Sequence, residues 1–129
     1  MTPFTEEAER LIRLAERDFQ TFTILCTHKE ADPVPTCFHA QQSVEKALKA
    51  VLTARQIAYR RTHDLEELFL LLKDVGISPP FPIDDYRRLN PFAVEMRYDD
   101  QTLVLVTQEE ANAIAQGTLT WAKEALSEA

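Results

Sequence analysis

Glycine is unusually scarce in this chain, and this scarcity constrains the fold more than any other feature of the sequence. Only 2 of the 129 residues are glycine, whereas folds built from tight hairpins, barrels or glycine-rich phosphate loops need many positions that accept positive φ angles. Hydrophobic residues make up 45% of the chain and charged residues 27%, which is ordinary for a domain with an ordered core. The sequence therefore predicts a mainly helical protein, folded as one domain over residues 1–129.

The charge balance and the N-terminal residues bear on where the protein works and what it binds. A net charge of −7 argues against broad, nonspecific wrapping of nucleic acid, so any nucleic-acid site must be local. No apolar run is long enough to cross a bilayer, and the first residues lack the basic start and apolar core of a signal peptide. We therefore expect a cytoplasmic protein with no membrane contact.

Apolar residues recur with helical spacing in most of the chain. This spacing predicts helices over residues 5–28, 36–57, 63–75 and from about 84, together with a last helix that follows the capping box Thr107-Gln108-Glu109-Glu110 and runs to about 127. Thr5 and Thr62 are the expected N-caps of the first and third helices. Pro33 and Pro35 predict a connector over residues 30–35, since proline cannot continue a helix.

Two further features complete the expected fold. Pro91 should bend or break the helix that begins near residue 84. The brief β-branched run over residues 103–106 has no partner strand and is expected to be extended, packed on the helices. The fold class predicted is all-α: an up-and-down antiparallel bundle of four main helices plus a kinked or partial fifth.

The helix expected over residues 36–57 has two contrasting faces at about 100° per residue. The core stripe centred on Val44 comprises Cys37, Ala40, Val44, Ala47, Leu48, Val51 and Leu52. The opposite face, expected to point away from the core and called the polar ridge below, comprises His39, Gln42, Lys46, Lys49 and Thr53.

A basic loop follows the polar ridge and ends in Arg60 and Arg61. Residues 36–63 hold five Lys or Arg residues and one acid, Glu45, which is unusual in an acidic chain. Lysine and arginine make charge-assisted hydrogen bonds to phosphate oxygens, so the ridge and loop favour a nucleotide or a short RNA as ligand. The simpler alternative is a solvated helix face, because exposed lysines at helical spacing are common.

The cysteines and nearby histidines raise the question of zinc. Cys26-Thr27-His28 and Cys37-Phe38-His39 offer two thiols and two imidazoles. Zinc ligand pairs usually have two to four intervening residues rather than one, and helical residues two apart point about 200° away from each other. We therefore expect free thiols and no metal or other cofactor.

Three motifs closely resemble those of HEPN domains. They are the string from His39 to Ala50 (HAQQSVEKALKA), then Thr62-His63-Asp64-Leu65, then Arg97-Tyr98-Asp99. The similarity spans about residues 5–126 and is most specific in the first motif. It implies an up-and-down helical bundle, usually a homodimer. The roles it implies are nucleotide binding, metal-independent RNA cleavage as a toxin, or work beside a minimal nucleotidyltransferase.

The resemblance also bears on catalysis. RNA-cleaving HEPN domains carry an arginine followed, after four to six intervening residues, by a histidine. Arg97 resembles that arginine, but Thr102, Leu103 and Val104 occupy the three positions, and none of them can act as a general base. We therefore expect a protein that is not a standard ribonuclease and has no standard catalytic residue.

The resulting expectation is a noncatalytic HEPN-like protein that binds a nucleotide or RNA phosphate, as the partner of a minimal nucleotidyltransferase in a toxin–antitoxin-like or stress-response module. Two alternatives stay open: a ribonuclease that uses Arg97 with a nonstandard base such as His63, and a pure protein-interaction module. His63 itself can contact phosphate or simply pack at a helix start. The predicted binding residues are His39, Gln42, Lys46, Lys49, Arg60, Arg61, His63 and Arg97.

Overall fold

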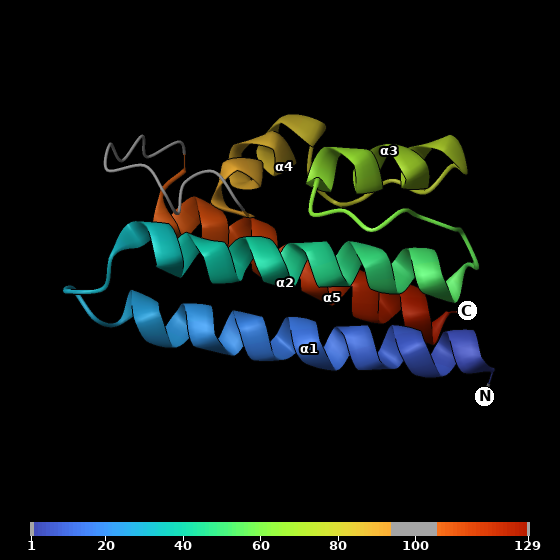
Figure 1. The fold of residues 1–129 in the computed structure, drawn as a ribbon, viewed down its shortest axis with the longest axis horizontal. Helices are drawn as coiled ribbons and strands as arrows, with labels where there is room; N and C mark the ends of the chain where they lie inside the picture. Colours follow the sequence, from blue (N-terminus) through green and yellow to red (C-terminus); the bar gives the residue numbers. More distant parts are fainter. Residues whose placement is uncertain (1, 94–105, 129) are drawn as a thin grey trace.

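The protein is described by a computed structural model that covers residues 2–93 and 106–128. These residues form five α-helices and one 3-10 turn: α1 (Pro3–Cys26), α2 (Pro33–Ala54), α3 (Leu65–Asp74), α4 (Ile83–Leu89), η1 (Asn90–Ala93) and α5 (Gln108–Ser127). Helices α1 and α2 run antiparallel, and α5 lies beside them with its C-terminal end near the start of α1 (Figure 1). The predicted all-α bundle is confirmed.

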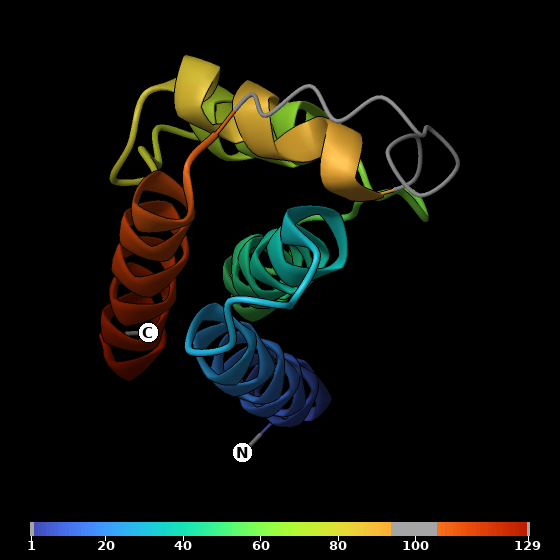
Figure 2. The ribbon, with the colours of Figure 1, turned by 90° about the vertical axis from the view of Figure 1, so that its left-hand side faces the viewer.

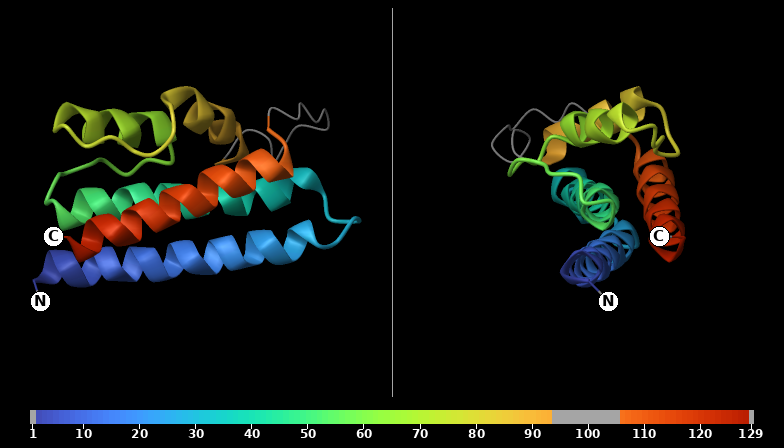
Figure 3. Two further views of the ribbon diagram at one scale, coloured as in Figure 1. Left: turned by 180° about the vertical axis from the view of Figure 1, so that it is seen from behind. Right: turned by 90° about the vertical axis from the view of Figure 1, so that its right-hand side faces the viewer.

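Helix α2 occupies the centre of the bundle. Helices α3 and α4 lie in a layer on one side of it and α1 lies on the other (Figure 2), while α5 closes a third side (Figure 3). Of the 22 residues of α2, 13 are buried, which is more than one apolar stripe can supply. The predicted core stripe is confirmed, because all seven of its residues are buried.

The N-terminal boundaries of α1 and α2 differ from the prediction for one physical reason. Proline is tolerated in the first helical turn, where the backbone N–H would have no helical partner. Helix α2 therefore begins at Pro33, and Asp32 caps it by accepting a hydrogen bond from the Val34 amide at 2.9 Å. Helix α1 begins at Pro3 under a Thr2 cap. The predicted start at residue 36 and the Thr5 cap are wrong.

The start of α3 also lies two residues later than predicted. Asp64, and not Thr62, is the N-cap, since its carboxylate accepts from the Glu66 amide at 3.0 Å. The side chain of Asn90 in η1 reaches the same place. Its oxygen accepts from the Leu65 amide at 2.8 Å, and its nitrogen donates to Asp64 Oδ1 at 2.8 Å. A residue from the far end of α4 thus fixes the N-terminus of α3.

Other boundaries agree more closely with the sequence. Gly76 follows α3 with a φ of +80°, the left-handed conformation that ends many helices. Pro91 breaks its helix rather than bending it, so that α4 stops at Leu89 and η1 follows. The capping box that starts α5 is confirmed at Thr107 and Glu110. Of the expected extended run 103–106, only Val106 lies within the described residues.

Two aromatic rings fasten α4 and the loop before it to α5. The buried Tyr86 hydroxyl hydrogen-bonds Thr118 Oγ1 at 2.9 Å, and burial raises the pKa of Tyr86 to about 12. The Phe81 ring stands edge-on to Tyr86, with 6.4 Å between the centroids. It also lies over Gly117, where a Cβ would be 2.6 Å from two of its carbons. Gly117 is therefore needed because the ring occupies that space.

Replacing Gly117 by alanine should lower the free energy of unfolding by about 1–3 kcal/mol, the cost of overpacking. At an exposed helical glycine, substitution by alanine would instead raise the free energy of unfolding by about 1 kcal/mol. The sign of the change measured by urea unfolding therefore distinguishes the two situations. Gly76→Ala is the matched control: it meets no atom within 4 Å and costs about 1–2 kcal/mol through its positive φ. Adding Phe81→Leu should restore the stability lost in Gly117→Ala but not the stability lost in Gly76→Ala. A stabilising Gly117→Ala change would contradict this packing.

Candidate functional site

The polar ridge of α2 is half-buried rather than turned fully to solvent. Helix α1 flanks it on one side, and the loop 55–64 returns along the other. Asp18 of α1 holds two of its residues: His39 Nδ1 lies 3.4 Å from Asp18 Oδ1, and the Lys46 ammonium donates to Asp18 Oδ2. The lysine charge is therefore already compensated by a carboxylate of the same chain.

A second cluster surrounds Glu45, whose side chain is only 4% exposed. One carboxylate oxygen accepts from Lys49 Nζ at 3.0 Å, and the other lies 2.9 Å from His63 Nδ1. Removing a carboxylate from water is unfavourable unless cations and donors surround it. Lys49 and His63 supply that environment, and they join α2 to the loop.

Two glutamine amides extend this cluster. The buried Gln41 donates through Nε2 to the His63 carbonyl at 3.0 Å and lies 3.4 Å from Glu45 Oε1. Gln42 donates to Gln41 Oε1 at 2.7 Å. Gln41 and Glu45 were not among the predicted binding residues. The four-residue spacing of Gln41, Glu45 and Lys49 was the available signal, because it places the three on one side of a helix.

The loop carries the most exposed cations of the site. Arg60 donates from Nε to Glu67 Oε1 at 2.7 Å, and its side chain is 72% exposed. Arg55 and Arg61 are exposed and have no ion pair within residues 2–93 and 106–128. His63 is 60% exposed, so its Nε2 is the ring nitrogen that can meet a ligand while Nδ1 faces Glu45.

The structure thus sorts the predicted binding residues into three groups. His39 and Lys46 meet at Asp18, Lys49 and His63 meet at Glu45, and Arg60 and Arg61 lie in the loop. Gln42 joins the Glu45 cluster through Gln41. Arg97 lies outside the described residues. The ridge is therefore a set of compensated ion pairs that continues into a loop where Arg60 pairs with Glu67 and Arg61 has no ion pair among the described residues.

The two thiols and the imidazoles considered for zinc all lie within the described residues. Across the described ranges, no group of three or more His, Cys, Asp or Glu side chains is arranged to hold a metal ion. Cys26 and Cys37 are free thiols. Burial raises the pKa of Cys37 to about 11, so the thiol is protonated and unreactive near neutral pH.

The geometry of the site supports two kinds of chemistry. Exposed guanidinium groups beside an imidazole suit the oxygens of a phosphate group. A carboxylate bonded to one imidazole nitrogen fixes the ring's orientation and leaves the other nitrogen to exchange protons with a ligand.

Comparison with known proteins places the chain. The sequence model of the HEPN domain matches residues 8–125. The chain belongs to the HEPN domain family. Neither the curated proteins nor the solved structures include a match. For this HEPN domain, none of the helices within the described residues has the length and apolar character of a membrane span.

The Glu45 cluster makes a prediction about stability. Glu45→Gln should lower the free energy of unfolding by about 3–5 kcal/mol, because it removes the charge that compensates the largely buried Lys49. Glu7→Gln is the matched control: Glu7 pairs with Arg10 on α1, but its side chain is 44% exposed, so about 0–1 kcal/mol is expected. Equal losses for the two variants in urea unfolding would contradict the structural role of Glu45.

Proposed function

We propose that this HEPN domain binds a nucleotide or an RNA phosphate without cleaving it, as the partner of a minimal nucleotidyltransferase in a toxin–antitoxin-like or stress-response module. One observation carries the binding proposal: cations accumulate along α2 and the loop beyond what nearby carboxylates compensate. Of the five Lys and Arg side chains of residues 36–63, Lys46, Lys49 and Arg60 pair with Asp18, Glu45 and Glu67. The other two, Arg55 and Arg61, pair with no carboxylate of the described residues.

Exposure indicates where the phosphate binds within this surface. Glu45 and Lys49 are nearly covered, with side chains 4% and 14% exposed, so a ligand meets the loop first. Arg61 forms no ion pair among the described residues, so it can bind a phosphate without breaking one. Arg60 can bind a phosphate oxygen in place of Glu67. His63 follows Arg61 by two residues in the sequence, and its Nε2 is available to a ligand. The phosphate is therefore expected at Arg60, Arg61 and His63.

The rest of the polar ridge supports this site at longer range. Lys46 and Lys49 offset the negative charges of Asp18 and Glu45, so these carboxylates repel a phosphate less. His39 and Gln42 add donors and acceptors along the same helix face for the remainder of the ligand. The partnership with a nucleotidyltransferase and the module are proposed only from the resemblance to HEPN domains.

The noncatalytic part of the proposal rests on the sequence. The chain has three histidines, and none follows an arginine at the spacing used by RNA-cleaving HEPN domains. Without an imidazole there, the 2′-hydroxyl of RNA has no standard base.

A binding titration with ATP and with a short single-stranded RNA tests the site. We expect Arg61→Ala to weaken binding of the better ligand by at least about tenfold, since it removes a charge-assisted contact worth about 1.5–3 kcal/mol. Lys46→Ala should weaken binding less, because it acts by leaving the negative charge of Asp18 uncompensated. Affinity should also fall with added salt. Lys29→Ala removes an exposed charge from the α1–α2 connection and should change nothing. Equal affinity in the parent protein and the three variants would contradict the proposed site. If the protein instead captures a protein partner and shows no salt-dependent binding of ATP or RNA, the interaction-module alternative is favoured.

The Glu45–His63 contact favours a second candidate function, a ribonuclease in which His63 is a nonstandard base. The carboxylate orients the ring through Nδ1 at 2.9 Å, which leaves Nε2 to remove a proton from a 2′-hydroxyl, while the loop arginines stabilise the developing phosphorane charge.

Incubation with tRNA in the presence of a chelator distinguishes this candidate from noncatalytic binding. If His63 is the base, the parent protein cleaves, and His63→Ala lowers the rate by about 100-fold or more, whereas His39→Ala does not. We expect no cleavage by the parent protein, and that result would contradict the ribonuclease hypothesis.

A further inference from the structure

A row of arginines follows the outer side of α1. Seven residues between positions 10 and 24 are exposed. At about 100° per residue, six of them lie within about 100° of one another, on the side opposite the buried residues of the helix. We call these six the arginine face: Arg10, Arg13, Arg17, Gln20, Thr21 and Ile24. The seventh, Glu16, lies beside α5 and accepts from Lys123 Nζ at 3.1 Å.

The positive charge of the arginine face is only partly compensated. Arg10 pairs with Glu7 at 2.7 Å. The guanidinium groups of Arg13 and Arg17 form neither an ion pair nor a hydrogen bond with any residue that the structure describes. Glu6, one turn before Arg10, marks the N-terminal limit of the face. The face is therefore locally cationic, although the net charge of the chain is −7.

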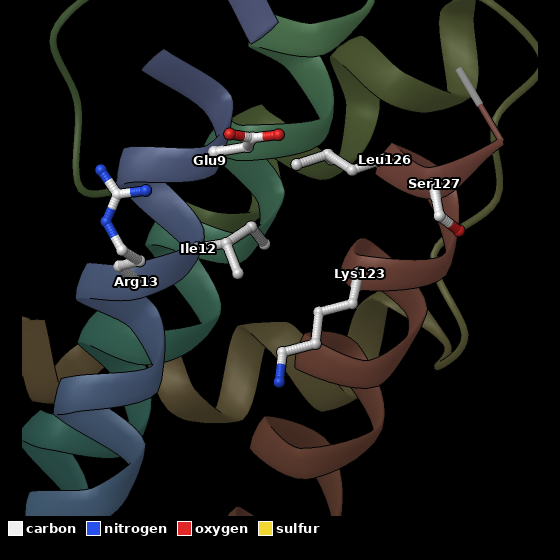
Figure 4. A pocket seen from close by; sticks show the side chains of 6 residues that line it. All are labelled: Glu9, Ile12, Arg13, Lys123, Leu126 and Ser127. Atoms are coloured by element: carbon white, nitrogen blue, oxygen red, sulfur yellow. The ribbon is translucent and has the colours of Figure 1, made fainter. Parts of the chain in front are cut away.

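The arginine face is open to solvent. Helix α1 packs on α2 and α5, and its outer side points away from both (Figure 2). On the side of α5, Ile12 points into the cavity between the two helices, whereas Arg13 points away from α5 (Figure 4). The flanking acids Glu16 and Asp18 pair with lysines of α5 and α2. A ligand can therefore reach Arg13 and Arg17 without displacing a carboxylate of the described residues.

The arginine face begins near the candidate phosphate site. Tyr59 of the loop lies beside the polar ridge, with 5.8 Å between its ring centroid and Lys49 Nζ. Tyr59 is also close enough to Arg10 to contribute to the raised pKa of that guanidinium, after the larger effect of the hydrogen bond with Glu7. From Arg10 the face continues along α1 for about 10 Å to Arg17. The loop and the arginine face thus form neighbouring parts of one cationic surface.

We propose that the arginine face binds the sugar–phosphate backbone of single-stranded RNA. The inference rests on the proposed function for its class of ligand, and it extends the contact from one phosphate at the loop to several along α1. Arginine suits this role because its planar guanidinium donates two parallel hydrogen bonds to a phosphate. Gln20 and Thr21 add neutral hydrogen-bonding groups beyond Arg17.

The length of the surface favours RNA over a mononucleotide. ATP carries its phosphates in one short group, so it can occupy the loop but cannot also reach Arg17, about 10 Å beyond Arg10. A single strand presents phosphates at regular intervals, and proteins that bind single strands follow the backbone with a positively charged surface. An acidic protein segment is the other polyanion that such a surface could attract, and competition distinguishes the two.

Parallel titrations of the full chain with ATP and with an oligouridine of about 12 nucleotides test the inference. Arg13→Ala/Arg17→Ala should weaken oligouridine binding at least about tenfold and reduce the slope of log affinity against log salt by about 1.4, or about 0.7 for each lost phosphate contact. Its affinity for ATP should not change. Both side chains are exposed, and alanine favours a helix, so circular dichroism should show an unchanged fold.

Lys73→Ala/Arg87→Ala is the matched control. It removes the same two positive charges from exposed positions on α3 and α4, which lie across α2 from α1 (Figure 2). Both its affinities should equal those of the parent protein. Equal losses in the two double variants would show a general effect of net charge and would overturn the inference.

The remaining outcomes separate this inference from the proposed function. If oligouridine affinity and salt slope are unchanged in Arg13→Ala/Arg17→Ala but fall in Arg61→Ala, the arginine face is not a binding surface and the loop site stands. If only Arg13→Ala/Arg17→Ala weakens oligouridine binding, the arginine face stands and the loop site does not. A parent protein that does not bind oligouridine would overturn the inference. So would polyglutamate that displaces the RNA at equal charge concentration, because the surface would then favour an acidic protein.

Discussion

The enclosure of α2 by its neighbours is the constraint on which the rest of this structure depends. Helices α1, α3 and α5 and the turn η1 all pack on it, so most of its circumference loses contact with water. Apolar residues can be buried there without hydrogen-bond partners. Gln41, Ser43 and Glu45 do not, because a buried polar group is costly unless it is hydrogen-bonded. Ser43 donates to the Ala15 carbonyl of α1 at 2.9 Å, and Glu45 draws in Lys49 and His63. The polar residues of the core thus determine where α1 and the loop 55–64 lie.

Much of the fold could be predicted from the sequence because the relevant signals are local. The apolar stripe of α2, the capping box at Thr107, the break at Pro91 and the turn at Gly76 each depend on a few neighbouring residues. The helix starts at Pro3 and Pro33 were misplaced because proline both ends helices and begins them, and the deciding hydrogen bond comes from the residue before it. The Asp64 cap involves Asn90, 26 residues away, which no local pattern reveals.

The candidate site was less predictable, since its character depends on which charges meet across helices. Periodicity correctly placed His39, Gln42, Lys46 and Lys49 on one side of α2. It could not reveal that Asp18, 28 residues from Lys46, would compensate that lysine. Nor could it show that Glu45 would be buried beneath His63. A projection of the residues of a single helix assumes that the face opposite the core is exposed to solvent. Here α1 and the loop cover part of that side, and the cations without an ion pair among the described residues are Arg55 and Arg61 of the loop.

The chain around His63 is held at three points. Gln41 donates to the His63 carbonyl, and Asn90 accepts from the Leu65 amide and donates to the Asp64 carboxylate. A loop anchored in this way has already lost most of its conformational freedom before any ligand arrives. Association then carries little of the ordering entropy that flexible loops must give up, often about 0.5–1.5 kcal/mol for each immobilised side chain. The same rigidity restricts the imidazole to a narrow range of directions, so ligand shape would be selected by geometry rather than by adjustment of the protein.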